Sequence, residues 1–161
     1  MFEERCGEDI RCKSSNTLFS IRSDRLDPAA ITARIGITPS SAWVKHEEYL
    51  SKAGPRRRPY GMWHLSTEGK VLSRSPEQQS LYLLRLLEPK TEFLQRLAED
   101  SDYLVIVKFW WESTDNIGGF ELSSGTAARL AAICKYIGFT VIGTCEDEEE
   151  TKQTPRPDPS L

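Results

Sequence analysis

Three consecutive arginines, Arg56, Arg57 and Arg58, are the densest group of like charge in this sequence that could bind a ligand, and Tyr60 and Trp63 follow them closely. Guanidinium groups bind phosphates and carboxylates, while aromatic rings stack on nucleotide bases or anchor protein partners. The stretch therefore suggests a contact with nucleic acid or with an acidic protein surface. The alternative is a solvated loop that leads into a strand.

The charge balance argues against nucleic acid. The 161-residue chain has a net charge of −3, and without the five acidic residues at 146–150 the rest would carry +2. Dedicated nucleic-acid domains usually show a basic stripe and a high isoelectric point. We therefore expect no nucleic-acid partner. The arginines then belong to a solvated loop, and an acidic protein partner stays open.

Two adjacent tryptophans, Trp110 and Trp111, form the second candidate site. Neighbouring side chains of a strand point to opposite faces of the sheet. We expect both rings to be buried in the core, with exposure of one as a partner anchor as the alternative, because Trp is enriched at interface hot spots. The candidate partner-binding residues are thus Arg56, Arg57, Arg58, Tyr60, Trp110 and Trp111.

Residue types that carry catalysis or bind metals are few and lack the spacing that their chemistry needs. The two histidines, His46 and His64, would have to converge with acidic or thiol groups, namely Glu47, Glu48, Cys134 or Cys145. The sequence has no HExxH, CxxC, GxSxG or phosphate-binding glycine motif. We expect no catalytic residue, no metal and no cofactor. His46 should lie on an exposed strand, His64 on the sheet face opposite Trp63, and the two later cysteines in the core.

Length and composition predict one domain with loose ends. Hydrophobic residues make up 39% of the chain and charged residues 28%, and the polar excess lies at the termini. We expect a flexible lead-in over residues 1–15, an α+β domain over 16–145 and a disordered acidic, proline-rich tail over 146–161. The charged start and the lack of long apolar runs predict a cytoplasmic protein that does not enter a membrane.

Hydrophobic periodicity and turn residues predict the order of elements. We expect strands over 16–23, 60–67, 102–111, 120–123 and 139–145, an extended segment over 41–50, and helices over 26–36, 75–100 and 123–138. Pro89 should break the second helix near Leu87 and Glu88. The strand over 102–111 should be covered on both faces, and Gly118 and Gly119 should form a hairpin turn. Residues 51–59, with two prolines and like charges, should form a loop.

One internal similarity bears on the fold class. Residues 19–38 and 120–140 both read as a strand, a capped helix, an Ile-Gly pair, an apolar residue and a threonine. This pattern favours an α+β domain with an antiparallel or mixed sheet, helices packed on one face, and two related βαβ-like halves.

The stretches "LDPAAITARIGITPSSAW", "GMWHLS", "LLRLLEPKTEFLQRLAE" and "ELSSGTAARLAAICKYIGFTVIG" also carry a family resemblance. Together they resemble the bacterial family catalogued as domain of unknown function 4279, over about Asn16 to Gly143. The resemblance implies a small bacterial domain. It implies no reaction and no catalytic residues.

These observations lead to two hypotheses of function. The first is a non-enzymatic protein-binding module, in its most concrete form an immunity or inhibitor protein that neutralises a bacterial toxin, since charge of both signs with aromatic anchors gives fast and specific association. The second is an enzyme or small-ligand-binding protein with a pocket between sheet and helices. Its polar groups would be His64, Glu47 and the arginine loop.

Overall fold

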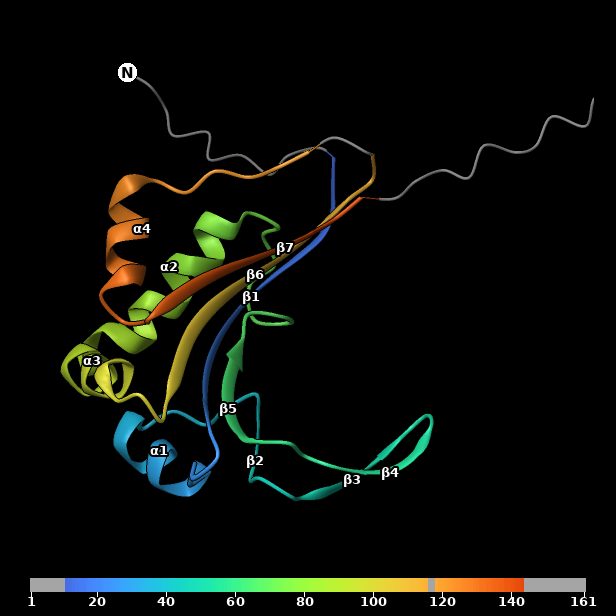
Figure 1. Cartoon of the computed structure of the whole chain (residues 1–161). Coiled ribbons are helices and arrows are strands. Elements are labelled where there is room, and N and C mark those ends of the chain that lie inside the picture. The colour runs from blue at the N-terminus through green and yellow to red at the C-terminus, as the bar shows by residue number, and fades with distance from the viewer. Residues whose placement is uncertain (1–10, 116–117, 144–161) are drawn as a thin grey trace, which may run out of the picture.

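The protein is built on a mixed five-stranded sheet beside a separate two-stranded hairpin, as Figure 1 shows. The computed structural model describes residues 11–115 and 118–143. The large sheet has the order β2-β5-β1-β6-β7, and β3 pairs with β4 in the small sheet. The strands are β1 (Cys12–Ser23), β2 (Ser41–Trp43), β3 (Glu48–Ser51), β4 (Gly54–Arg57), β5 (Gly61–Ser66), β6 (Leu104–Ser113) and β7 (Tyr136–Ile142). The expected α+β class is confirmed.

The helices all lie against one face of the large sheet (Figure 1). They are α1 (Pro28–Ile35), α2 (Pro76–Leu87), the short 3-10 helix η1 (Glu88–Lys90), α3 (Thr91–Glu99) and α4 (Ser124–Ala131). The predicted break at Pro89 is confirmed, because α2 ends at Leu87 and η1 separates it from α3. Asp27 caps α1 as expected, since its Oδ1 accepts hydrogen bonds from the backbone N–H groups of Ala29 and Ala30 at 2.9 and 3.2 Å.

The core lies between the helices and one face of the sheet. Along β6, Val105, Val107 and Phe109 are buried against the helices, and Trp111 on the same face is buried beside Gly118, whereas the alternate residues are not buried. The prediction that this strand is covered on both faces was wrong, because no helix of the described residues packs on the other side. Leu18, Ile106, Lys108 and Trp110 share that face, which we call the open face.

The chain leaves β6 by a crossover rather than by the predicted hairpin. Residues 120–123 form no strand and lead directly into α4, and β7 then pairs with β6 in parallel. Helix α4 ends at Ala131, so Tyr136 and Ile137 begin the last strand instead of ending a helix. The hairpin prediction failed because Gly118 packs closely against Trp111 instead of forming a turn between paired strands. A Cβ at Gly118 would strike the Trp111 ring.

Two predicted boundaries also change. Strand β1 begins at Cys12, so residues 12–15 belong to the sheet and not to a flexible lead-in. Residues 51–59 are not a loop throughout, because Gly54–Arg57 form β4 and pair with β3. Gly54 makes this possible with a φ of 104° at the tight turn. Residues 1–10, the predicted tail at 146–161 and Cys145 lie outside the described residues.

The internal similarity does not mark equivalent positions. Both halves contain a strand-helix-strand unit, β1-α1-β2 and β6-α4-β7. However, Ile35 and Gly36 end a helix, with Gly36 in the left-handed region at φ 74°, whereas Ile137 and Gly138 lie inside β7. Over the residues that the structure describes, none of the helices is long and apolar enough to cross a membrane.

Candidate functional site

The β3–β4 hairpin projects from the sheet as an arm, well separated from the helices (Figure 1). We define the basic arm as residues 44–59. It carries five basic side chains and two acidic ones, which gives a net charge of +3 with His46 neutral. The basic side chains are Lys45, Lys52, Arg56, Arg57 and Arg58, and the acidic ones are Glu47 and Glu48. The charge that the sequence suggested for a loop is therefore presented on a paired hairpin.

Arg58 fastens the arm to the sheet rather than facing a partner. Its guanidinium carbon lies 3.9 Å from the ring centroids of both Trp43, in β2, and Tyr49, in β3. The Arg58 backbone N–H donates to the carbonyl of Glu47 at 2.9 Å, and its own carbonyl accepts from the N–H of His46 at 2.8 Å. Such cation–π contacts contribute most where the cation is shielded from water. Arg58 is half-buried, and its role in the structure is to order the arm.

The other two arginines differ from Arg58 and from each other. Arg57 is paired with Glu48, whose Oε1 accepts from the Arg57 Nε at 3.1 Å and from its Nη2 at 2.9 Å. Both side chains are 69% exposed, so this pair adds little to stability. Arg56 is exposed and makes no ion pair with any described residue. Among the three arginines, Arg56 is therefore the one whose charge neither pairs with an acidic residue nor lies on a ring within the part of the chain that the structure describes.

The tip of the arm adds an apolar contact surface. Leu50 is 83% exposed on β3, and its register partner on β4 is Pro55, which is also exposed. Lys52 follows in the turn and is exposed as well. A leucine flanked by unpaired cations is the composition of an interface anchor with a charged rim.

The two tryptophans point to opposite faces, as predicted. Trp111 is 1% exposed and lies in the core, but Trp110 is 40% exposed on the open face, so the prediction that both are buried was wrong for Trp110. The physical reason is that no element among residues 11–115 and 118–143 covers the face on which Trp110 lies. Tyr60 lies at the base of the arm, where its carbonyl accepts a hydrogen bond from the Trp43 indole N–H at 3.1 Å.

Neither histidine is part of a catalytic cluster among the described residues. His46 lies in the turn before β3 with a φ of 66°, so its predicted place on a strand was wrong. His64 lies on β5 opposite Trp63 across the strand, as predicted, and its imidazole approaches the Ser41 hydroxyl, at 3.1 Å from Nε2 and 3.4 Å from Nδ1. The hydroxyl thus faces the ring edge between both nitrogens. No carboxylate of the described residues orients this ring, as nucleophilic serine–histidine pairs require.

Electrostatics around His64 and Cys134 also differ from those of a catalytic pair. Burial, and after it the positive charge of Arg22, lower the pKa of His64 below its ordinary value. Burial raises the pKa of the Cys134 thiol, which donates to the carbonyl of Leu130 at 3.1 Å. Glu47 lies on the arm, where it accepts from the Val44 N–H at 3.3 Å. Within the described ranges, no three His, Cys, Asp or Glu side chains are grouped so that they could hold a metal ion.

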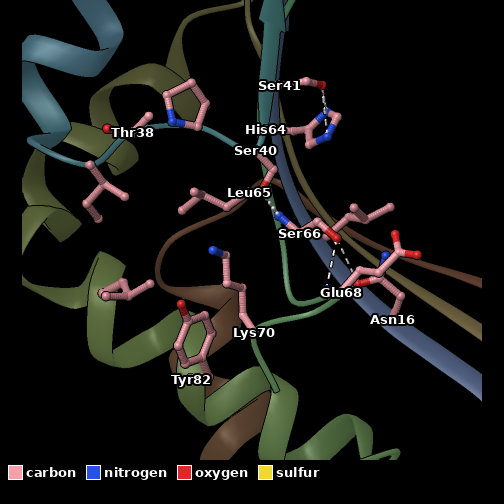
Figure 2. Close-up of a pocket in the computed structure, with 14 residues that line it drawn as sticks. Asn16, Thr38, Ser40, Ser41, His64, Leu65, Ser66, Glu68, Lys70 and Tyr82 are labelled. Carbon is pink, nitrogen blue, oxygen red and sulfur yellow. Dashed lines mark hydrogen bonds between the residues drawn. The ribbon is translucent and has the colours of Figure 1, made fainter. Parts of the chain in front are cut away.

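A groove of about 1000 Å³ runs along the C-terminal half of β5. Figure 2 shows His64 and Ser66 of β5, Tyr82 of α2, and Lys70 from the segment between these elements. A smaller hollow of about 330 Å³ shares Asn16, Leu18 and Glu68 with it and extends to Trp110 on the open face. Of the polar groups that we nominated for a ligand pocket, His64 lines this groove, but Glu47 and the three arginines do not.

Sequence reasoning missed the aromatic partners of the arm, Trp43 and Tyr49. The only local signal was that these two aromatic residues stand on either side of the polar stretch 45–48. Their contact with Arg58, however, joins residues of three different segments, and no local pattern predicts it.

Comparison with known proteins agrees with the resemblance seen in the sequence. Neither the curated proteins nor the solved structures contain a match to the chain. The family described as Domain of unknown function (DUF4279) matches residues 13–141, which is most of the chain and covers the described strands and helices except the first residue of β1 and the last residue of β7. The protein therefore belongs to this family, Domain of unknown function (DUF4279).

Proposed function

We propose that this protein is a non-enzymatic binding module that docks an acidic surface of a partner protein against its basic arm. The observation that carries the proposal is the combination, on one projecting hairpin, of a net charge of +3 with Leu50 at 83% exposure. Charge of one sign accelerates encounter with a surface of opposite sign, and an exposed apolar side chain at its centre supplies affinity once water is expelled.

The way in which the arm is held supports this role. Arg58 lies between Trp43 and Tyr49, so the arm enters an encounter already ordered. A pre-ordered surface avoids part of the entropy cost of association. Trp110 and the hollow beside it offer a further contact on the open face.

The concrete form of the proposal is an immunity or inhibitor protein whose partner is a bacterial toxin, in the cytoplasm. The basic arm restricts which toxin it fits. An enzyme that degrades nucleic acid has a basic substrate surface, which the arm would repel, so the complementary toxin presents an acidic surface. Toxin neutralisation and the cytoplasmic location both stay predictions.

Capture from native cells tests the proposal with three forms of the protein. The wild type is compared with Leu50→Ala/Arg56→Ala, which removes the anchor and the free cation of the arm. The matched control is Leu72→Ala/Arg85→Ala, because Leu72 is 97% exposed and Arg85 is exposed outside the arm. The captured protein is purified, and its association rate with each form is measured at low and high salt.

The arm variant should associate at least about tenfold more slowly, with a weaker salt dependence, while the control should match the wild type. Equal association rates of the arm variant and the control would refute docking on the arm. Retention of unrelated duplex DNA by the wild type at physiological salt would also refute the proposal, since it would identify the arm as a polyanion contact.

The groove along β5 favours a second candidate function, the binding of a small ligand. It brings His64, Lys70 and Tyr82 around one concave space that is large enough for a small molecule. Screening of soluble metabolites by ligand-observed NMR tests this candidate, with the wild type and Tyr82→Ala compared for each ligand. Ligands that bind Tyr82→Ala as well as they bind the wild type would count against the groove as the binding site.

A further inference from the structure

A third cavity lies at the end of the sheet where β1 leaves it and where β6 and β7 begin. It has a volume of about 580 Å³, within the range of roughly 300–1000 Å³ that small-molecule sites occupy. Its lining combines three tyrosines with three cations, namely Tyr60, Tyr103, Tyr136, Arg22, Arg25 and Lys135. The basic arm contributes none of these side chains, so the cavity is a separate site.

Each cation of the cavity lies over one of the tyrosines. The distances to the ring centroids are 5.3 Å from Arg22 to Tyr60, 5.5 Å from Arg25 to Tyr103 and 5.8 Å from Lys135 to Tyr136. A ring face attracts a cation but does not neutralise its charge. The rings therefore orient the cations and leave their hydrogen-bond donors available.

Both acidic residues that line the cavity already form ion pairs with basic residues other than Arg22 and Lys135. Asp102 pairs with Arg25 at 3.0 Å, and Arg25 also reaches Asp100 at 2.9 Å. Asp24 pairs with Lys45 of the basic arm. Arg25 is thus compensated twice over, and neither carboxylate of the lining is left to serve Arg22 or Lys135.

Arg22 and Lys135 are the uncompensated charges. Neither forms an ion pair or a side-chain hydrogen bond with any residue of 11–115 or 118–143, and the Arg22 Nε is buried without an acceptor. Burying part of a guanidinium without an acceptor costs free energy. The Arg58 Nε is buried in the same way, but the Arg58 guanidinium lies 3.9 Å from two ring centroids, whereas Arg22 has one ring at 5.3 Å. The unsatisfied donor and the second free cation indicate that the cavity is completed by an anion.

We propose that this cavity binds a small organic anion, with a phosphate or carboxylate group between Arg22 and Lys135 and its organic body among the tyrosine rings. A guanidinium presents a planar fork of donors that matches both kinds of oxyanion, and the ammonium adds a point charge. The tyrosine hydroxyls are further donors to the same oxygens. The cavity is larger than the oxyanion alone needs, and its aromatic walls suit an apolar body.

Four probe compounds separate the parts of this proposal. Phenyl phosphate and benzoate carry both charge and ring, inorganic phosphate lacks the ring, and benzyl alcohol lacks the charge. Each is titrated into the full chain while the tyrosine ring signals and the His64 signals are followed by NMR. A bound anion should also raise the pKa of His64, because it offsets the Arg22 charge that lowers it.

Three variants assign the binding to its residues. Arg22→Met and Lys135→Met each remove one cation of the cavity, and Lys52→Met removes one exposed cation at the tip of the arm as the matched control. Each cavity variant should weaken binding of the charged aromatic probes about tenfold or more, since it removes a charged hydrogen-bond donor to the oxyanion. The control should bind as the wild type does. Lys135 is exposed, so Lys135→Met keeps the test valid even if Arg22→Met fails to fold.

Saturable binding of phenyl phosphate or benzoate that both cavity variants weaken would support the proposal, and the stronger probe would identify the preferred oxyanion. Equal weakening in Lys52→Met would overturn it, because the effect would then be general charge attraction. Absence of saturation by either aromatic anion up to about 10 mM, roughly ten times a dissociation constant of 1 mM, would overturn it too. Tight binding of benzyl alcohol would show an apolar pocket and refute the anion site. None of these outcomes depends on the partner of the arm.

Discussion

The Arg58 guanidinium carbon lies 3.9 Å from the centre of the Trp43 ring, in a contact that joins the basic arm to the edge strand β2. Trp43 in turn meets the His64 ring edge to face, with centroids 6.1 Å apart. Arg58, Trp43 and His64 therefore form a continuous row of contacts from the arm to the sheet. The basic arm that we propose for partner binding is therefore held in place by Arg58, which does not itself face the partner.

Replacing Arg58 by methionine should destabilise the protein more than the same change at Arg56. The first change removes cation–π contacts with Trp43 and Tyr49, each contributing about 0.5–2 kcal/mol. We expect Arg58→Met to lower the free energy of unfolding by about 1–3 kcal/mol and Arg56→Met to change it by less than ~0.5 kcal/mol. Urea unfolding of the two variants measures both values. Equal effects would show that the stack does not stabilise the arm.

Replacing Glu77 by alanine should loosen the junction between α2 and α4. This buried carboxylate accepts from the Ser123 N–H at 3.1 Å, the Ser123 hydroxyl at 2.9 Å and the Thr126 hydroxyl at 2.6 Å. Its loss leaves the buried Thr126 hydroxyl without this acceptor and removes two hydrogen bonds from Ser123, which is exposed, at a cost of about 1–3 kcal/mol. Thermal unfolding, with exchange of the α4 amides as a local measurement, checks this. A variant as stable as Glu92→Ala, a change at an 87% exposed side chain on α3, would contradict the expectation.

Local patterns predicted the elements whose causes are local. Strand β5 follows from the alternation that places Trp63 and Leu65 on one face, and the end of α2 follows from Pro89. The direction in which β7 joins the sheet was missed, because the choice between a hairpin and a parallel crossover depends on packing. The contact between Gly118 and Trp111 is part of that packing, and no turn signal encodes it.

The candidate sites were predictable in composition but not in geometry. The arginine run stood out as charge, yet its three members have three different roles, since Arg56 is free, Arg57 pairs with Glu48 and Arg58 lies between two rings. No motif or spacing in the sequence marked Arg22 as a candidate site residue. Its importance comes from the absence of an acceptor beside it in the folded chain, over the residues that the structure describes, and sequence spacing contains no record of that.

The stability of the protein should depend on pH through His64. Burial and the charge of Arg22 lower the His64 pKa below 6.5, so between the lowered pKa and 6.5 the unfolded chain binds more protons than the folded chain. The contribution of His64 is therefore fully present above this window and is lost as the pH falls through it. Urea unfolding of the wild type and His64→Gln from about pH 5 to 8 measures the difference. A difference that stays constant, or that moves against the wild type as pH rises, would contradict the assignment.

Replacing Gly118 by alanine should destabilise the crossover from β6 to α4, whereas the same change at Gly119 should not. A Cβ at Gly118 would strike Cη2 of the Trp111 ring, and it would lie 2.9 Å from Cζ3 and 3.0 Å from the Ser113 hydroxyl oxygen. Trp111 is buried in the core and has little room to move. Overpacking of this kind costs about 1–3 kcal/mol.

Gly119 is the matched control for this change, because a Cβ there meets no atom of the described residues within 4 Å. Tryptophan fluorescence during urea unfolding reports both variants, since Trp111 is one of the four tryptophans that give the signal and its ring must shift. We expect a lower midpoint for Gly118→Ala, together with an altered folded-state spectrum. The midpoint of Gly119→Ala should equal or slightly exceed that of the wild type, because alanine restricts the unfolded chain more than glycine does. Two equal midpoints would show that the chain at 118 can move away from Trp111, and that the crossover does not depend on this contact.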